Sequence, residues 1–350
     1  MSTTTIHPAY SLRKIIDRSG MTQQEVALRL DMSEKHLSEI LNEKKGITTE
    51  TALKLEQIFW GNASFWINLQ ARYDEMNARK SIEESMQDQI HLLDAFKDCY
   101  ADLILLGFCK KTKDKIEKVS ELLSFFNVTS LTNVRAAFQV AFRKSSRSAV
   151  SNESVAAWLR VWEIKASELN VNEFDADKLS RALVHIRNIT QDGDSFLKNL
   201  FQVGRECGVK FIFVTHFKHA PVNGAARWID GYPIVQLSDM GKKYDRIIFT
   251  LFHEIGHILL HTNESFFDEK VGLDYAVEKE LEADRFAQEC VIPKEYNFSG
   301  RLSELTRSEQ KTQEFAKEVG VDVSVIVWRI QRELNDYTIF HHLLKQAVIH

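Results

Sequence analysis

Three residues within five positions of this sequence have the types and spacing of a catalytic zinc site. His253 and His257 enclose Glu254 in the pattern H-E-x-x-H, inside a segment apolar enough to be a buried helix. Because residues four apart share one face of a helix, both imidazoles can turn a nitrogen toward a single Zn²⁺. Glu254 would then stand beside the ion, placed to take a proton from a zinc-bound water. The alternative interpretation is a pair of core histidines on a helix.

A hydrolytic zinc site needs a third protein ligand and one position left for water. His261 is one candidate, but it follows His253 by two steps of four residues and lies too far along the helix axis to close the same site easily. The metzincin spacing requires Gly at position 260 and His at position 263, where this sequence has Leu260 and Asn263. That class is therefore excluded, and we expect the third ligand elsewhere.

The segment 277–292 offers such a ligand. On a helical wheel, Glu280 and Asp284 fall on the apolar face, whereas Glu282 falls on the opposite, solvated face. The apolar residues of that face are Val277, Ala283, Ala287, Cys290 and Val291. A buried acid is costly unless it is paired or coordinated, so we expect Glu280 to be the third ligand, with Glu282 as the alternative. Asp284, one turn later, is expected to accept the free N–H of a zinc-binding histidine.

Four sequence blocks around these positions resemble the ImmA/IrrE family of zinc metallopeptidases. They occur at residues 224–238, 249–254, 282–287 and 291–293, and the resemblance covers roughly residues 205–300. The order H-E-x-x-H then E-x-x-x-D also resembles the thermolysin-like zincins, in which a glutamate is a ligand. The resemblance implies peptidase activity on protein substrates, often repressors of the helix-turn-helix class.

Strand signals precede the candidate zinc helix. Residues 209–216 are rich in β-branched and aromatic types, and the runs 225–229 and 232–238 flank an Asp-Gly pair, a strong hairpin signal. Pro233 would suit an edge strand, because proline cannot donate a hydrogen bond to a neighbouring strand. In zincins an edge strand beside the metal commonly pairs with an extended substrate. We therefore expect the hairpin either to bind substrate or simply to cover the active-site helix.

A second, unrelated signal lies at the other end of the chain. Residues 22–42 have the pattern helix, tight turn, helix, with Thr22 and Ser33 as good N-caps and Glu25 completing a capping box with Thr22. The turn requires left-handed backbone, which Asp31 tolerates. The apolar residues predicted to face inward are Val26, Leu30, Leu37 and Ile40.

This segment resembles the Cro/repressor type of helix-turn-helix and, with residues 47–53 and 64–74, HigA-type antitoxins over about residues 7–75. The resemblance implies that the second helix, residues 33–42, enters the major groove of an inverted-repeat operator as part of a homodimer. It also implies a cognate toxin as a partner. Residues expected to contact phosphates are Gln23, Gln24, Asn42, Lys44 and Lys45. The base-facing residues are Glu34, Lys35, His36, Ser38 and Glu39, with Ser33 at the start of the helix.

The charge of this segment is unusual for a DNA-binding domain. Residues 1–75 carry nine Lys/Arg and ten Asp/Glu, a net charge of −1, although such domains usually present a basic surface to phosphates. Glu34 and Glu39 place acid on the recognition helix itself, where a glutamate can accept from cytosine N4 but is repelled by phosphate. The alternative is a helical module that binds protein instead of DNA.

Composition favours a helical protein with more than one domain. The 350 residues suffice for two or three domains, and only four prolines and 14 glycines interrupt them. No apolar stretch is long enough to span a membrane, and the first residues lack secretory character. The cysteines show no paired spacing, so we expect reduced thiols in a cytoplasmic protein. They are Cys99, Cys109, Cys207 and Cys290.

We therefore expect an α+β, mainly α architecture in three parts. A five-helix helix-turn-helix module spans residues 1–78, a helical connector or regulatory region spans 79–195, and a zincin-like domain with a small sheet and C-terminal helices spans 196–350. The expected function is a DNA-binding transcriptional regulator or antitoxin whose fused zinc metallopeptidase cleaves a repressor, a partner or itself. The alternative is an antitoxin or repressor whose zincin domain is a sensor or interaction module without significant protease activity.

In the expected mechanism, Zn²⁺ held by His253, His257 and Glu280 lowers the pKa of its bound water toward about 7. Glu254 takes the proton as this water attacks a peptide carbonyl, and then delivers it to the leaving amine. The oxyanion also needs a hydrogen-bond donor. The candidates, among which the sequence does not choose, are Tyr232, His216, His219, Tyr244 and Arg246.

Overall fold

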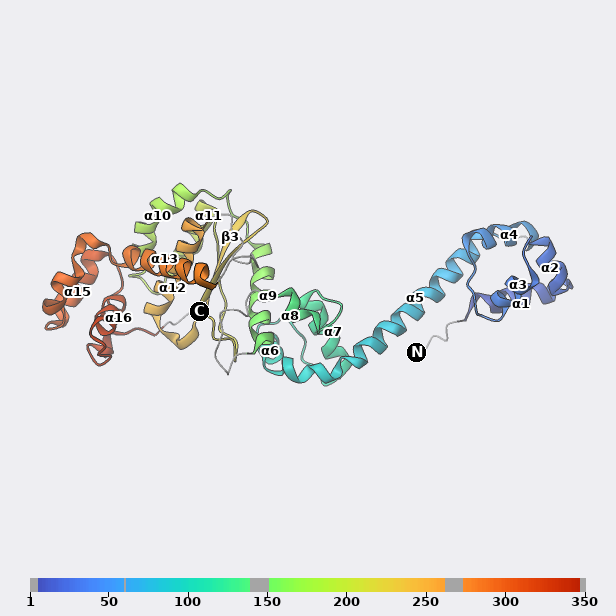
Figure 1. Cartoon of the computed structure of the whole chain (residues 1–350), viewed down its shortest axis with the longest axis horizontal. Helices are drawn as coiled ribbons and strands as arrows, with labels where there is room; N and C mark the ends of the chain where they lie inside the picture. Colours follow the sequence, from blue (N-terminus) through green and yellow to red (C-terminus); the bar gives the residue numbers. More distant parts are fainter. Residues whose placement is uncertain (1–5, 60, 139–150, 262–272, 347–350) are drawn as a thin grey trace. The chain divides into compact units, whose positions relative to one another are not determined.

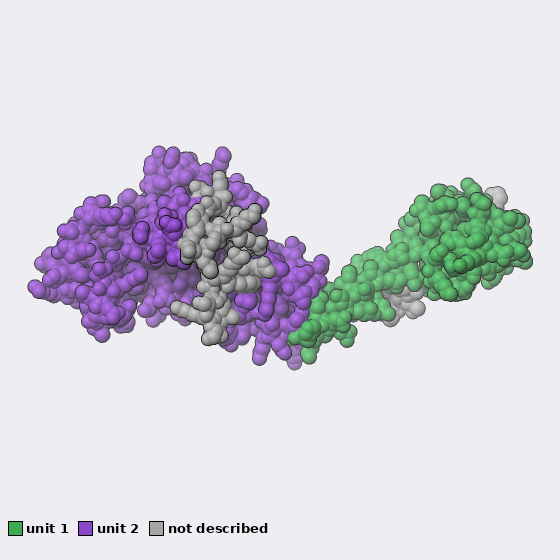
Figure 2. Space-filling view, viewed as in Figure 1, with its two compact units in different colours: residues 1–91, 114–119 green, residues 92–113, 120–350 purple. Residues whose placement is uncertain are grey.

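The computed structural model describes residues 6–59, 61–138, 151–261 and 273–346. It divides into two compact units, one formed by residues 1–91 with 114–119 and the other by residues 92–113 with 120–350 (Figure 2). Helices dominate, and the described residues contain one small sheet, so the predicted α+β, mainly α fold class is confirmed. None of the described helices combines the length and the apolar character needed to cross a membrane. The boundaries of the predicted three-part division stay a prediction.

The first unit begins with five helices that share one apolar core (Figure 1). They are α1 (Pro8–Ser19), α2 (Gln23–Arg29), α3 (Glu34–Leu41), α4 (Thr49–Phe59) and α5 (Ala63–Asp88). All four residues predicted to face inward on α2, on α3 and in the turn between them are buried, so that prediction is confirmed. Leu12, Leu55 and Trp66 bring the other three helices into the same core.

The two N-caps and the left-handed turn between α2 and α3 are as expected from the sequence, whereas the described contacts of Glu25 are not those of a capping box. Thr22 Oγ1 and Ser33 Oγ accept hydrogen bonds from the backbone N–H groups three residues later, at 3.2 Å and 3.1 Å. These bonds satisfy N–H groups that have no partner inside a helix. Asp31 adopts a left-handed φ of 49°. The Glu25 carboxylate pairs with Arg29 at 2.8 Å and supports its own helix.

Six further helices precede or flank the sheet of the second unit. They are α6 (Leu93–Leu105), α7 (Lys115–Phe126), α8 (Asn133–Ala137), α9 (Asn152–Glu168), α10 (Ala176–Ile189) and α11 (Phe196–Cys207). The four cysteines are free thiols, as predicted. Burial raises the pKa of Cys109 and of Cys290 to about 12, which keeps both in the neutral form.

The sheet has three strands in the order β1-β3-β2. β1 (Lys210–Phe213) runs parallel to β3 (Tyr232–Leu237), and β2 (Gly224–Ile229) runs antiparallel to β3. The hairpin between β2 and β3 turns at Asp230 and Gly231, whose φ angles of 51° and 81° are those of a two-residue hairpin turn. The predicted hairpin is confirmed, and β2 is an edge strand of the sheet.

The prediction that Pro233 lies on an edge strand is wrong, because Pro233 is part of the central strand β3. Pro233 pairs with Trp228. The neighbouring pair, Ile229 with Tyr232, closes the hairpin. Hydrogen-bonded and non-hydrogen-bonded pairs alternate along an antiparallel ladder, so the proline removes no bond to β2. Pairing with β1 starts only at Ile234, so the proline is tolerated on that side as well.

Helix α12 (Tyr244–Leu260) lies at the centre of the core of the second unit (Figure 1). It packs against β2 and β3, against α13 (Leu273–Val291) and against α16 (Val323–Leu334). Its fully buried residues include Ile248, Leu251, Phe252 and Ile255. Two more helices, α14 (Phe298–Leu305) and α15 (Glu309–Val319), join α13 to α16, so the expected C-terminal helices are present.

Gly256 allows α12 and α13 to approach closely. A Cβ atom built at this position would lie 2.9 Å from Phe286 Cδ1 and 3.4 Å from Ala283 Cα, both on α13. A close-packed interior has no room for an additional carbon atom unless the neighbouring side chains shift. Gly256 lies between Glu254 and His257, so it sets the separation of the two helices that carry the candidate ligands.

We predict that Gly256→Val lowers the free energy of unfolding by about 1–3 kcal/mol, because the added side chain must displace α13. Denaturant unfolding measures this change, and the metal content of the purified variant should fall with it. Gly193→Ala serves as a control, since a Cβ there meets its nearest neighbour, Tyr244 Cζ, only at 3.9 Å. A Gly256→Val protein with the stability and metal content of the parent would contradict the close helix approach.

Candidate functional site

Of the three residues of the H-E-x-x-H pattern on α12, His257 and Glu254 are buried and His253 is partly buried. His257 exposes 2% of its surface and Glu254 exposes 6%. The Nε2 atoms of His253 and His257 are 3.0 Å apart, so the two rings turn the same nitrogen toward one point. This convergence follows from their four-residue spacing on a helix.

Helix α13 adds a carboxylate to this point. Glu280 Oε2 lies 3.3 Å from His253 Nε2, and Glu280 Oε1 lies 3.6 Å from His257 Nε2. Within the described residues, His253, His257 and Glu280 form a group whose ligand atoms all lie within 4.8 Å of one another. The structure thus brings together the three residues that the sequence nominated as metal ligands.

The donor atoms of this group fit Zn²⁺. Zinc binds imidazole nitrogen and carboxylate oxygen at about 2.0–2.2 Å in tetrahedral geometry, which places the ligand atoms of one ion about 3.3–3.6 Å apart. The separations of 3.0, 3.3 and 3.6 Å in this cluster are close to that spacing. Two imidazoles and one carboxylate also leave a fourth position, which hydrolytic zinc sites use for water.

Asp284 contacts the other side of one of these histidines. Its Oδ1 lies 2.8 Å from His253 Nδ1. Because a carboxylate can only accept, in the neutral ring this contact places the proton on Nδ1 and leaves the lone pair of Nε2 directed into the cluster. Such a partner fixes both the tautomer and the orientation of a metal-binding histidine.

The observed buried face of α13 differs from the one predicted from the sequence. Val277, predicted to be buried, is 59% exposed. The side chains of Glu280 and Asp284 are each 40% exposed, so these acids lie at the margin of the buried face and not in its middle. Ala283 and Ala287 are fully buried and form the centre of that face. The reason is that α12 covers only a narrow strip of α13, where small residues permit contact.

Glu282 is distinguished from Glu280 by the histidine that it faces. Its side chain is 48% exposed, little more than that of Glu280, but its Oε2 lies 3.0 Å from His261 Nε2. His261 Nδ1 in turn lies 3.3 Å from His257 Nδ1, on the side of that ring opposite the cluster. Sequence reasoning considered His261 only as a ligand and missed this contact. The four-residue spacing of the two histidines was the available signal.

Carboxylates around His253 raise its pKa above the ordinary value. Burial of the ring disfavours the charged form, but the hydrogen bond that the protonated ring makes to Glu280 and the negative charges of Glu254, Glu280 and Asp284 outweigh it. The same negative charges favour a cation at the point where the ligand atoms converge.

The edge strand β2 begins beside Glu254. A Cβ atom built at Gly224 would lie 3.2 Å from Glu254 Oε1 and 2.5 Å from Thr250 Cγ2. A side chain at position 224 would therefore collide with α12 next to the candidate base. The glycine brings the backbone of the edge strand close to the cluster.

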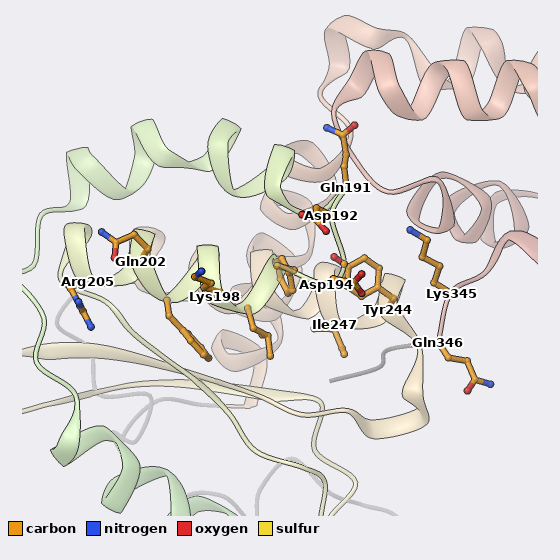
Figure 3. Close-up of a pocket in the computed structure, with 14 residues that line it drawn as sticks. Gln191, Asp192, Asp194, Lys198, Gln202, Arg205, Tyr244, Ile247, Lys345 and Gln346 are labelled. Carbon is orange, nitrogen blue, oxygen red and sulfur yellow. The ribbon is translucent and has the colours of Figure 1, made fainter. Parts of the chain in front are cut away.

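A pocket of about 870 Å³ lies at the first turn of α12, away from the histidines (Figure 3). Tyr244 forms part of its wall and donates its hydroxyl to Thr190 O at 2.8 Å. This hydroxyl is directed toward α10, more than two helical turns from His253, which argues against Tyr244 as the oxyanion donor. Other residues of the wall include Phe196, Lys198, Phe201 and Lys345.

The residues expected to contact DNA lie in the first unit, on and around α3. Most of them are exposed, whereas the side chains of His36, Ser38 and Glu39 are partly buried. The exposed residues are Gln23, Gln24, Ser33, Glu34, Lys35, Asn42, Lys44 and Lys45. The exposed face therefore carries both acidic and basic side chains.

One of the two acids on this helix is paired. Lys45 Nζ lies 2.8 Å from a carboxylate oxygen of Glu39. The hydrogen bond and charge of Lys45, with the charges of Lys35 and His36, hold the pKa of Glu39 below its ordinary value. The pair lessens the repulsion that Glu39 would exert on a phosphate, but it also occupies Lys45.

Two protein families match this sequence. The family described as helix-turn-helix matches residues 12–59, from α1 to the end of α4. The peptidase family described as IrrE N-terminal-like domain matches residues 212–331, from β1 into α16. The second match contains the three candidate ligands His253, His257 and Glu280.

Virulence-associated proteins of Dichelobacter nodosus are similar to part of the chain. Virulence-associated protein A′ is 34% identical over 88 residues, which cover 25% of this chain and 73% of that protein. Virulence-associated protein I is 39% identical over 70 residues, which cover 20% of this chain and 65% of that protein. The chain thus spans just under two thirds of the length of protein I.

Two solved structures of HigA proteins are also similar to part of the chain. The antitoxin HigA of Pseudomonas aeruginosa, solved with the higBA promoter, is 27% identical with a TM-score of 0.23, over 24% of this chain and 94% of that chain. A HigA-family addiction module antidote protein from Coxiella burnetii is 30% identical with the same TM-score and the same coverage. The family matches and the curated relatives together show that this chain belongs to the helix-turn-helix proteins and carries, fused to that domain, an IrrE N-terminal-like domain of a peptidase family.

Proposed function

We propose that this chain is a DNA-binding transcriptional regulator or antitoxin whose second unit is a zinc-dependent peptidase. The observation that supports the peptidase most directly is the convergence of two imidazole Nε2 atoms and one carboxylate beside the buried Glu254. A domain that served only as a scaffold would need neither this donor set nor a neighbouring base. The match to a peptidase family agrees with this proposal.

In the proposed site, His253, His257 and Glu280 would hold the zinc ion. Bound zinc would act as a Lewis acid, lowering the pKa of a water molecule and polarising the peptide carbonyl. Glu254 would accept the proton of the attacking water and pass it to the leaving amine nitrogen. Asp284 would keep His253 in the tautomer that presents Nε2, since its carboxylate lies 2.8 Å from Nδ1.

The proposed substrate is a protein segment that binds in extended form along β2. An edge strand offers unpaired N–H and C=O groups to which a peptide can add as a further strand. β2 begins at Gly224, whose missing side chain lets the strand approach Glu254. A peptide paired with β2 would therefore pass close to the base and the ligand cluster. Repressors of the helix-turn-helix class, a cognate toxin and the chain itself are the candidate substrates.

For the first unit we propose that α3 enters the major groove of an inverted-repeat operator, with two copies of the chain on the two half-sites. The capping of α3 by Ser33 and its exposed polar face support this proposal. The Lys45–Glu39 pair removes part of the electrostatic objection raised by the net charge. Lys44 remains as the exposed basic residue next to this pair and is the expected phosphate contact.

The ligand assignment is tested by two matched substitutions on α13. Glu280→Gln should lose zinc at stoichiometric protein concentration, because an amide is a poor replacement for a carboxylate ligand. Glu282→Gln should keep its zinc at that concentration, because its carboxylate faces His261 and is not itself a ligand. Elemental analysis after dialysis measures both. Zinc retained by Glu280→Gln and lost by Glu282→Gln would reverse the assignment.

Catalysis is tested by Glu254→Gln, which removes the proton acceptor and leaves each proposed ligand in place. We expect normal zinc and DNA binding together with a loss of substrate cleavage by about 10²–10⁴-fold or more, since the acid–base contribution is removed. Quantification of the uncut substrate and of transcription from the regulated promoter measures the effect in cells. If the variant responds to the inducing signal as the parent does, cleavage is not the function of the domain.

DNA binding is tested by Lys44→Ala. We expect weaker binding to all DNA sequences, because one phosphate contact is lost. The slope of the logarithm of the binding constant against the logarithm of the salt concentration should become smaller by about one. Lys80→Ala on α5 removes an exposed lysine that is paired with Glu84. This control should leave the DNA affinity and its salt dependence unchanged. If the full-length protein gives no footprint even at low salt, the first unit is a protein-binding module.

A further inference from the structure

We propose that Glu282 and His261 form a relay that positions His257 as a metal ligand. This inference rests on the proposed function, in which His257 Nε2 is a zinc ligand. The relay is the chain of contacts from Glu282 Oε2 to His261 Nε2, at 3.0 Å, and from His261 Nδ1 to His257 Nδ1, at 3.3 Å. Neither residue belongs to the ligand cluster itself.

With both rings neutral, the chemistry of these groups allows one arrangement of protons. To bind zinc, His257 must present a lone pair at Nε2, so its ring proton is on Nδ1. That proton faces His261 Nδ1, which must then be the acceptor and carry no proton. The proton of His261 is therefore on Nε2, where it faces Glu282 Oε2, a group that can only accept. The carboxylate at the end of the relay thus determines which nitrogen of His257 is free for the metal.

The two ligand histidines are supported by parallel means. His253 Nδ1 contacts the carboxylate of Asp284 directly, whereas His257 Nδ1 reaches the carboxylate of Glu282 through a second imidazole. Helix α13 thus supplies the ligand, Glu280, and both supporting carboxylates, Glu282 and Asp284. His261 can fill the intermediate place because it ends α12 one turn after His257.

Burial gives this relay its energetic importance. His261 exposes 6% of its surface and His257 exposes 2%, so water has little access to the hydrogen-bonding nitrogens between them. A donor left unpaired in such a place retains its full desolvation cost. Loss of a hydrogen-bonding partner of a metal ligand typically lowers metal affinity 10- to 100-fold.

The test compares substitutions of similar shape but different hydrogen bonding in the full-length protein. His261→Phe fills the space without an acceptor, and we expect its zinc affinity, measured by chelator competition, to fall about 10- to 100-fold. His261→Asn keeps an acceptor oxygen near His257 Nδ1 and should recover most of that loss. Glu282→Gln should weaken zinc binding less than His261→Phe, and Glu278→Gln, the same change at an exposed position one turn earlier on α13, should have no effect.

A second measurement is independent of whether the variants fold. In the zinc-loaded parent protein, ¹⁵N-detected imidazole spectra should show His261 as the Nε2–H tautomer and His257 as the Nδ1–H tautomer. An Nδ1–H tautomer for His261, or parental zinc affinity in a folded His261→Phe protein, would overturn the relay while leaving the metal centre intact. A parent protein that binds no zinc would overturn the proposed metal centre and the relay with it.

Discussion

The close approach of α12 and α13 is the constraint on which the candidate metal centre depends. At Gly256 on α12 the Phe286 ring of α13 leaves no room for an added carbon atom, and at this separation the carboxylates of α13 reach the histidines of α12. Metal ligands must be held to within a few tenths of an ångström of their ideal distances. A packing contact without any polar atom therefore sets the geometry of the chemistry.

The negative charge of the carboxylates between α12 and α13 favours a bound cation. Glu254, Glu280, Glu282 and Asp284 bring acidic groups around His253, His257 and His261 within two helices. Like charges in a partly buried site repel one another more strongly than they do in water. The raised pKa of His253 is one response, since a proton on the ring offsets part of that repulsion. A divalent ion at the convergence of the ligand atoms would offset more of it and would keep both imidazoles neutral.

Much of this arrangement could be predicted because it depends on local periodicity. The four-residue spacing of His253 and His257, the caps of α2 and α3 and the Asp-Gly hairpin each depend on residues close in sequence. The errors concern partners that only the tertiary structure supplies. Pro233 is tolerated in a central strand because the pairing of β3 with β1 begins only at Ile234. Val277 is exposed because α12 covers a narrow strip of α13. The Glu282–His261 contact joins two helices whose register no local pattern defines.

In the proposed function, zinc would also act as a structural component of the α12–α13 junction. The candidate ligands come from both helices, so an ion held by all three would bind the folded junction and not its separated halves. Such binding adds to stability by mass action, about 4 kcal/mol when free zinc exceeds its dissociation constant a thousandfold. The same binding would offset the carboxylate repulsion that otherwise opposes the close approach at Gly256. The packing that creates the site and the ion that occupies it would thus stabilise each other.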